Sequence, residues 1–343
     1  MKAKRIQKIF STTLASLLLG VCLPTATVSA EVGENNYAYS FAVVGDPQII
    51  TESYPDKVHY IYDWILENKE SKNIQFAFNL GDSTNIGATA EWQLISSQIK
   101  RLDDIIPYSI IRGNHDDILN YDTYFKYQDY ADTLSGTFDG TMKNTYQKFS
   151  IGNIKYMVVA LDLGASDAVL GWADRLISLH GDYNVIVTTH AYLKANGQYL
   201  TGTKTRYGAY NDGDEIFDKL IKKHENIVMT LCGHDPHDYV LQKQSTGENG
   251  NVIQELLVNP QGLDKANGAN GLVAMLYFSA DGKTVDVEYY NTITGEEHLP
   301  DNAFSFELNV IEATDSVHSY CDWTQIDTYT VRECTLCGHL QSK

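Results

Sequence analysis

Side chains able to bind metal ions follow five short apolar segments, at the point where each segment ends. The endings are Gly45-Asp46-Pro47-Gln48, Gly81-Asp82-Ser83-Thr84-Asn85, Arg112-Gly113-Asn114-His115-Asp116, Thr189-His190 and Gly233-His234-Asp235-Pro236-His237. Carboxylate, amide and imidazole groups together suit divalent ions such as Mn, Fe and Zn. Each motif alone is a weak indication. Five in order predict a dinuclear metal site, in which a carboxylate bridges ions about 3.5–4 Å apart.

The segments before these motifs are expected to be buried β-strands. Residues 39–45, 74–80 and 107–112 are short and apolar, and helical periodicity at 58–66 and 89–101 separates them. This β-α-β-α-β order predicts a sheet covered by helices. In open α/β sheets, ligands bind at the carboxyl ends of the strands. We therefore expect the motifs to converge at that edge.

The second half of the chain predicts a further sheet. Residues 146–162 are typical of a hairpin with Gly152-Asn153 as its turn, and strands are expected at 184–189 and 227–232. Three late strands, which we expect to pair antiparallel because short links join them, cover 252–258, 272–279 and 284–290. The sequence thus predicts a layered α/β body with two sheets.

Taken together, the five motifs resemble those of the calcineurin-like metallophosphoesterase superfamily over residues 38–300. The resemblance implies a four-layer αββα sandwich of two mixed sheets with a dinuclear metal site between them. It implies two sets of metal ligands, which are Asp46, Gln48, Asp82 and His237 for one ion, and Asn114, His190 and His234 for the other. Asp82 would bridge the ions, and His115 would be the catalytic side chain that faces the leaving group.

The activity implied by the resemblance is metal-dependent hydrolysis of phosphate mono- or diesters. The ions would lower the pKa of a bridging water, whose hydroxide attacks phosphorus, and His115 would protonate the leaving oxygen. The implied cofactors are two divalent ions. Mn or Fe is favoured over Zn, because Gln48 supplies a neutral oxygen where the family usually has His. The expected substrate is a phosphorylated small molecule, a nucleotide or a phospholipid head group.

Two departures from the family pattern leave an alternative open, a catalytically inert metal-binding protein at the cell surface. One is Gln48. The other is Asn85, which stands where many members have an Asp that pairs with the catalytic His, and an amide cannot stabilise an imidazolium by charge. Asp116 is a second candidate partner for His115. Retention of His115 and of the whole second ligand set favours the enzyme.

Four side chains are candidate phosphate or leaving-group contacts to the substrate: Arg112, Tyr192, Lys194 and Arg206. A solvated surface role is favoured for all but Tyr192, which lies beside His190. The segment Asn259-Pro260-Gln261-Gly262 follows a strand, and it fits a lining of the cleft or an ordinary turn equally well.

The N-terminus predicts a signal peptide over residues 1–30. Basic residues between positions 2 and 8, an apolar stretch over 14–23 and Val28-Ser29-Ala30 give the order of charged, apolar and small residues that such peptides have. We therefore expect a secreted, extracellular protein, with association at the cell surface as a further option. The formal net charge of −18 argues against non-specific nucleic-acid binding, which needs a basic face.

The C-terminus predicts a small separate module. Residues 31–310 are expected to form the metallophosphoesterase domain, and residues 311–343 a Cys- and His-rich tail that contacts the cell surface. A tetrahedral zinc site would use Cys321, Cys334, Cys337 and His339. A disulfide that leaves one thiol over is equally compatible with these residues in a secreted chain.

Overall fold

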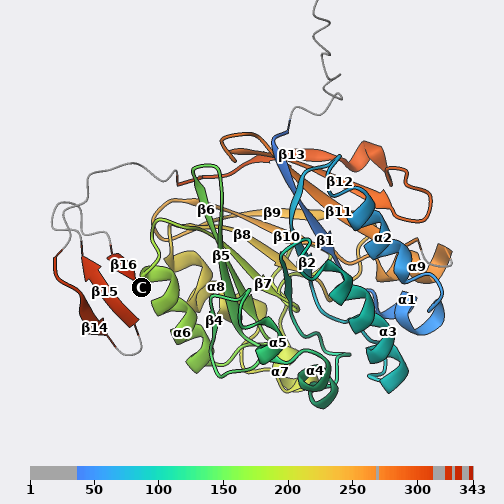
Figure 1. Ribbon diagram of the computed structural model, residues 1–343, viewed down its shortest axis with the longest axis horizontal. Coiled ribbons are helices and arrows are strands. Elements are labelled where there is room, and N and C mark those ends of the chain that lie inside the picture. Colours follow the sequence, from blue (N-terminus) through green and yellow to red (C-terminus); the bar gives the residue numbers. More distant parts are fainter. Residues whose placement is uncertain (1–36, 268–269, 312–320, 327–328, 334–339, 343) are drawn as a thin grey trace, which may run out of the picture. The chain divides into compact units, whose positions relative to one another are not determined.

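A computed structural model describes residues 37–267, 270–311, 321–326, 329–333 and 340–342 (Figure 1). The expected signal peptide lies outside the described residues. Of the four expected tail ligands, only Cys321 is described, and its side chain is exposed. The choice between tail zinc and a disulfide therefore stays a prediction.

The first sheet has six strands in the order β13-β12-β11-β1-β2-β3. Their bounds are β1 Tyr39–Val44, β2 Ile74–Asn79, β3 Tyr108–Ile110, β11 Leu272–Phe278, β12 Thr284–Asn291 and β13 Phe304–Glu307. β1, β2 and β3 run parallel, whereas β11 pairs antiparallel with both β1 and β12. The sheet is mixed, and the strands that precede the first three motifs are neighbours in it.

The second sheet has seven strands in the order β4-β5-β6-β7-β8-β10-β9. Their bounds are β4 Gly136–Thr137, β5 Thr145–Ile151, β6 Ile154–Leu161, β7 Asn184–Thr189, β8 Ile227–Cys232, β9 Leu241–Thr246 and β10 Val252–Leu257. The predicted hairpin is confirmed as β5 and β6, which pair antiparallel. From β6 to β10 the pairs β6–β7, β7–β8 and β8–β10 are parallel.

The expected pairing of strand 252–258 with the later strands is wrong. β10 lies in the second sheet, parallel to β8, and its antiparallel partner is β9. Helix α9 (Gln261–Asn267) separates β10 from β11, so the chain has room to change sheets there. β9 was missed because it is a polar edge strand, in which half-buried and exposed residues alternate without an apolar run.

Helices cover the outer faces of both sheets. Side chains from α1 to α5 share one apolar cluster with the outer face of the first sheet, and side chains from α6 and α8 share another with the second sheet. The helices are α1 Gln48–Ser53, α2 His59–Glu67, α3 Thr89–Ile99, α4 Ile118–Tyr124, α5 Tyr127–Tyr130, α6 Asp167–Ser178, α7 Thr203–Tyr207 and α8 Gly213–Lys219. The order helix, sheet, sheet, helix is the predicted four-layer sandwich (Figure 1).

Aromatic side chains fill the layer between the two sheets. The Phe41 ring from the first sheet is 4.6 Å from the ring centroid of Phe278 and 5.5 Å from that of Tyr156, which belongs to the second sheet. The hydroxyls of Tyr39 and Tyr156 are 2.7 Å apart across the same layer, and both side chains are buried. These contacts hold the two sheets at a fixed separation, which the site at their shared edge requires.

Three short strands near the C-terminus, β14 (Thr324–Ile326), β15 (Tyr329–Glu333) and β16 (Leu340–Ser342), pair antiparallel in a small sheet. The segment that follows β13 is fixed at Ile311, whose N–H donates to Asn184 Oδ1 at 2.7 Å and whose carbonyl accepts from Asn184 Nδ2 at 2.9 Å. Across the described part of the chain, no helix has the length and apolar character needed to cross a bilayer.

Replacing Phe41 by Ala should destabilise the protein strongly. Phe41 is fully buried between the sheets. Loss of a buried phenyl ring costs about 3–5 kcal/mol of unfolding free energy. Urea denaturation measures this change. Leu119→Ala is the control, because Leu119 is 77% exposed, and a surface substitution of this kind changes stability by about 0.5 kcal/mol at most. Equal losses for both variants would contradict this packing.

Candidate metal centre

The five strand endings meet where the two sheets share an edge. From the first sheet, the loops after β1, β2 and β3 supply Asp46, Asp82 and Asn114, and from the second sheet the loops after β7 and β8 supply His190 and His234. These side chains come from positions up to 188 residues apart in sequence, as in the contact of His234 with Asp46. The predicted convergence is therefore found.

Asp82, Asn114, His190 and His234 form the tightest part of the cluster. Asn114 Oδ1 is 3.1 Å from His190 Nε2 and 2.7 Å from His234 Nδ1. Asp82 Oδ2 is 3.3 Å from His190 Nε2. Ligand atoms of Asp82, His190 and His234 all lie within 4.8 Å of one another, which is close enough for one metal ion to contact all three.

Asp46 and Gln48 form the other half of the cluster. Gln48 Nε2 donates to Asp82 Oδ2 at 3.1 Å, and Asp46 Oδ2 accepts from the His234 main-chain N–H at 2.8 Å. The remaining oxygens, Asp46 Oδ1 and Gln48 Oε1, are buried and have no hydrogen-bond partner among the described residues. Buried acceptors of this kind are rare unless an ion or water meets them. The donor set therefore fits divalent metal ions.

Left-handed backbone places three of these side chains. Asp46, Asp82 and His234 have φ values of 40°, 47° and 76°. Non-glycine residues in this region cost about 1–3 kcal/mol each, so the surrounding structure must hold them there. Neighbouring glycines allow the close approach, since a Cβ on Gly233 would lie 2.0 Å from Asp46 Oδ1 and a Cβ on Gly113 would lie 2.1 Å from Asp82 Oδ1.

Burial and charge act in opposite directions on the cluster. Burial lowers the pKa of His190, but the carboxylates of Asp82 and Asp46 outweigh it and raise that pKa to about 10. Burial raises the pKa of Asp46 well above its usual range. Burial and the neighbouring positive charge of His190 lower the pKa of His234 to about 4. The two buried carboxylates thus need positive charge beside them, and a divalent ion supplies it.

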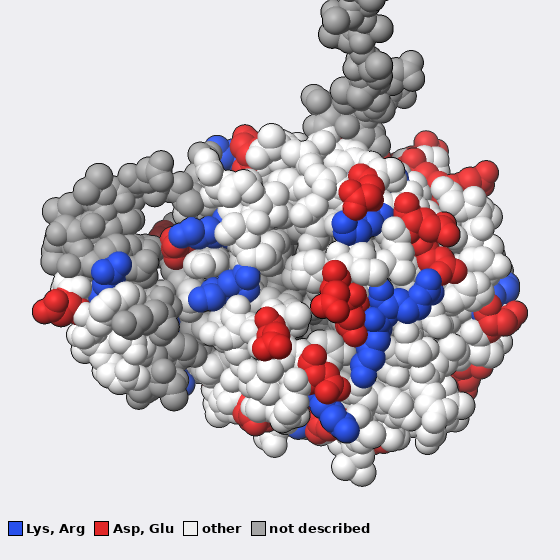
Figure 2. Space-filling model, in the orientation of Figure 1, with Lys and Arg blue, Asp and Glu red and all other residues white. Residues whose placement is uncertain are grey.

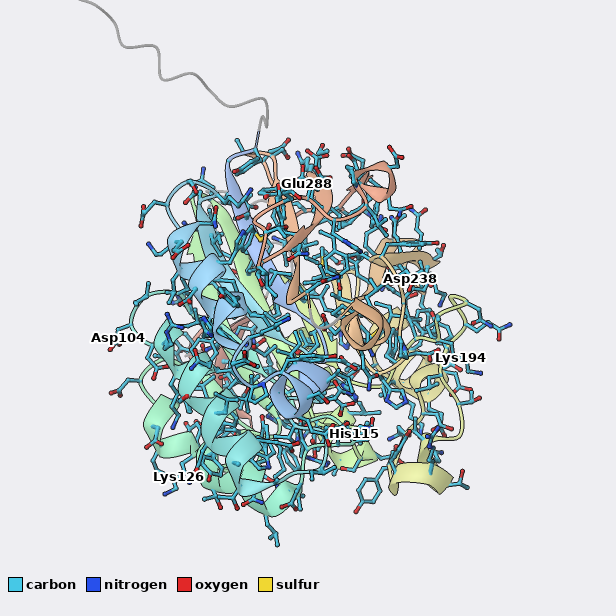
Figure 3. The ribbon with its side chains drawn as sticks, turned by 90° about the vertical axis from the view of Figure 1, so that its right-hand side faces the viewer. Asp104, His115, Lys126, Lys194, Asp238 and Glu288 are labelled. Carbon is cyan, nitrogen blue, oxygen red and sulfur yellow. The ribbon has the colours of Figure 1, made fainter. Side chains whose placement is uncertain are left out.

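His115 is fixed beside the cluster by its main chain and its ring. Its N–H donates to Asp82 Oδ1 at 2.9 Å, and its ring Nδ1 is 2.6 Å from the main-chain oxygen of Asn85. Because a carbonyl oxygen only accepts, Nδ1 carries the hydrogen and Nε2 is the free ring atom. Figure 3 shows His115 in the lower part of the molecule.

Asn85 and Asp116, the expected side-chain partners of His115, form their hydrogen bonds with other groups. The Asn85 amide donates to Glu52 Oε2 at 2.7 Å, so Asn85 reaches the His115 ring through its main chain only. Asp116 is buried and accepts from the main-chain N–H groups of Gly113, Ser83 and Thr84, at 2.9, 3.2 and 2.9 Å. Asp116 therefore joins the loops after β2 and β3, and it orients the backbone that carries Asp82 and His115.

His237 is the one predicted ligand whose side chain forms no hydrogen bond with the rest of the cluster among the described residues. Its ring packs against the Tyr239 ring with centroids 4.2 Å apart, and its Nδ1 is 3.0 Å from the Tyr239 oxygen. Among the described residues, no hydrogen bond or ion pair joins its ring to Asp46 or Asp82. Its main-chain N–H, however, donates to the Asn259 oxygen at 3.0 Å, so its loop is tied to the site.

Asn259 is a site residue whose role the sequence left undecided. It is fully buried, and its amide donates to Asp46 Oδ2 at 2.6 Å. The segment after β10 therefore contacts Asp46, a candidate metal ligand, and is more than an ordinary turn. The sequence feature that could have indicated this role is the position of Asn259 directly after a buried strand, which the five motifs share. An Asn-Pro pair is so common in turns that it could not decide the matter.

Two candidate substrate contacts are occupied by other partners. Arg112 holds Asp162 through two parallel hydrogen bonds of 2.9 and 3.0 Å. The Tyr192 ring is buried, and its hydroxyl donates to Glu255 at 2.5 Å, so the candidate that was not assigned a solvated surface role is a structural residue and not a substrate contact. Tyr192 is buried because it belongs to the apolar cluster on the outer face of the second sheet.

The fold and this cluster define a class of protein, an α/β sandwich that holds metal ions at the edge shared by two mixed sheets. Residues 39–238, more than half of the chain, match the family model described as calcineurin-like phosphoesterase. The chain therefore belongs to the calcineurin-like phosphoesterase family, as the five motifs indicated.

Similarity to individual proteins is distant. The chain is 24% identical over 327 residues to the uncharacterized protein YvnB of Bacillus subtilis, covering 89% of this chain and 24% of that protein. It is 23% identical over 163 residues to a probable glycerophosphodiester phosphodiesterase, GpdQ, of Arcobacter nitrofigilis, covering 45% of this chain and 54% of that protein. The chain thus spans about a quarter of the first relative and about half of the second.

A solved structure supports the fold alone. Purple acid phosphatase PPD1 from yellow lupin superposes with a TM-score of 0.51 at 14% identity, over 78% of this chain and 53% of that chain.

A third curated relative, a probable cyclic nucleotide phosphodiesterase of Moraxella catarrhalis, is 19% identical over 58% of this chain and 72% of its own length.

Replacing Gly233 by Ala should remove bound metal while leaving most of the fold intact. The new methyl group would displace Asp46 Oδ1, which a Cβ at this position would approach to 2.0 Å. After reconstitution with Mn, the metal content measured by elemental analysis should fall from about two ions per chain to below one. Gly181→Ala is the matched control, because a Cβ there meets nothing within 4 Å. Full metal content in Gly233→Ala would contradict the assigned role of Asp46.

Proposed function

We propose that this protein is a metal-dependent phosphodiesterase. The observation that carries the proposal is the pair of buried, unpartnered oxygens of Asp46 and Gln48, beside the Asp82, His190 and His234 cluster. Two curated relatives bear phosphodiesterase names, which supports a diester over a monoester substrate. The intact cluster and the adjacent His115 favour this function over an inert metal-binding protein.

Two sets of side chains would hold the ions. Asp46, Gln48 and Asp82 form one set, and Asp82, Asn114, His190 and His234 form the other; membership of His237 stays a prediction. When bound, the ions make a coordinated water more acidic and neutralise charge on the phosphoryl oxygens. We favour Mn or Fe over Zn, because the ligand at position 48 is a neutral amide oxygen.

His115 is the proton donor in this proposal. The Asn85 carbonyl holds the hydrogen on Nδ1, so Nε2 is the atom available to the leaving oxygen. The main-chain contact to Asp82 keeps the ring next to the metal ligands. In its imidazolium form, which carries a hydrogen on each ring nitrogen, His115 gives the Nε2 proton to the departing alkoxide and is left neutral with its hydrogen on Nδ1, which is general acid catalysis.

Location and partners form part of the same proposal. The order of basic, apolar and small residues over 1–30 supports secretion, and the small sheet of β14, β15 and β16 supports a separate C-terminal module. Contact of this module with the cell surface is part of the proposal. On the face that Figure 2 shows, Lys and Arg side chains lie interspersed with Asp and Glu and form no broad basic area. This distribution supports a small phosphorylated substrate over non-specific nucleic-acid binding.

The function is tested by assaying the protein after reconstitution with Mn, Fe, Zn or Mg. The substrates are bis(4-nitrophenyl) phosphate, 4-nitrophenyl phosphate and glycerophosphodiesters. We expect metal-dependent turnover, with diesters preferred and Mn or Fe most effective. Absence of turnover with every metal, in protein that has bound two ions, would overturn the proposed function.

Replacing Asp82 by Ala should reduce both metal content and turnover more than replacing Gln48 by Ala. Asp82 contacts both halves of the cluster, whereas Gln48 offers one neutral oxygen to one half. Loss of a single supporting group typically costs about 10–100-fold in activity or metal affinity. We expect a loss of that size for Gln48→Ala and a larger loss for Asp82→Ala. Equal, mild effects in elemental analysis and steady-state kinetics would refute the bridging role.

Replacing His115 by Ala should lower turnover while metal content stays unchanged. General acid catalysis contributes about 10²–10⁴-fold. The loss should be near the upper end for alkyl leaving groups and much smaller for nitrophenolate, which departs without a proton. Kinetics on paired alkyl and aryl esters measure this difference. A loss of equal size for both esters, or loss of metal, would mean that His115 is a ligand or a structural residue.

A further inference from the structure

A short helix between β7 and α8 contacts the metal ligands from outside the sheets. α7 ends at Tyr207, whose ring meets the His234 ring edge-on, with centroids 5.3 Å apart and planes at 87°. In Figure 3, the short yellow helix at the lower right is α7, and it lies at the same end of the molecule as His115. α7 therefore borders the site on the side of His234.

Asp212 fixes the start of α7. Its Oδ1 accepts from the main-chain N–H groups of Thr203 and Lys204 at 2.9 and 3.2 Å, and its Oδ2 accepts from Gly202 at 2.9 Å. The Thr203 hydroxyl also donates to Asp212. Gly202 and Gly208, with φ of 91° and 69°, form the sharp turns at either end. The helix is thus anchored to the residue before α8, and its last two residues have a defined place.

Arg206 presents an unpaired positive charge beside this border. Its guanidinium carbon lies 5.0 Å from the centroid of the Tyr207 ring. Stacking on a ring face leaves the in-plane N–H donors of arginine available. The side chain is exposed and forms no ion pair with any residue in the described ranges, whereas Arg112 is occupied by Asp162. Arg206 is therefore free to bind an anion.

The surroundings of Arg206 indicate which anion this is. The Tyr207 ring contacts both the ring of His234, a candidate metal ligand, and the Arg206 guanidinium. The reacting phosphoryl group would lie against the metal ligands. The Arg206 guanidinium stacks on Tyr207 and is exposed, so it would meet a part of the substrate that does not react.

We propose that Arg206, positioned by Tyr207 and Asp212, binds an anionic group on the non-reacting ester arm of the substrate. This inference rests on the proposed phosphodiesterase function, because only a diester keeps a second arm. The substrate class is a phosphodiester whose second arm ends in a phosphate or a carboxylate. Both groups accept two parallel hydrogen bonds from one guanidinium.

The test uses three 4-nitrophenyl phosphodiesters that share a leaving group and differ only in the second arm. The arms are 2-methoxyethyl, 2-carboxyethyl and 2-phosphoethyl. We expect the metal-reconstituted protein to prefer a charged arm by roughly 10–100-fold in kcat/KM, the size of a hydrogen bond to a charged group. Arg206→Gln should abolish this preference and leave turnover of the neutral arm within about twofold. Arg206→Lys should restore part of it, because charge remains.

Lys126→Gln is the matched control, since it removes one exposed positive charge that lies on the loop before α5. It should leave the preference unchanged. The ratio between the carboxylate and phosphate arms tells which anion the site prefers. A wild-type protein with no preference, or an Arg206→Gln variant equally slow on all three esters, would overturn the inference.

Absence of diester hydrolysis can be distinguished from absence of anion binding at Arg206. If no ester is turned over, binding of the same three esters is measured by calorimetry in wild type and Arg206→Gln. Tighter binding of the charged arms, lost in the variant, would uphold Arg206 as an anion site although the protein does not hydrolyse diesters. Equal binding of all three arms would reject it.

Discussion

Burial of two carboxylates at one edge of the sandwich is the constraint on which the other features depend. Asp46 and Asp82 are 0% and 2% exposed, so their charges are removed from water and must be met inside the protein. Main-chain N–H groups, the Asn259 amide and the His190 ring meet part of this charge. Asp46 Oδ1 and Gln48 Oε1 have no hydrogen-bond partner among the described residues, so they are available to bind a metal ion.

The two sheets matter because neither holds the cluster alone. The first sheet supplies both carboxylates, and the second supplies both imidazoles. The aromatic layer between the sheets fixes the separation over which these groups meet. Asp116 acts in the same way on a smaller scale, since it joins the loops after β2 and β3. Packing far from the site therefore determines the geometry of the metal ligands.

The sequence was sufficient for the parts of the structure that have a strong local signal. Buried strands followed by Gly, Asp, Asn or His predicted the converging loops and most of the ligand cluster. The position of β10 could not be predicted, because the choice of sheet depends on a long-range pairing. The carbonyl of Asn85, the amide of Asn259 and the aromatic ring of Tyr207 also escaped prediction. Their roles depend on which way the chain turns after each element, and residue type does not encode this.

The left-handed backbone at Asp46, Asp82 and His234 has an evolutionary consequence. Glycine and asparagine adopt this conformation readily, whereas β-branched residues do so at high cost. An Asp to Asn change needs a single base and keeps the local chain path, yet it removes the charge that attracts an ion. Descendants of such a protein can thus lose metal binding in one step and keep the sandwich.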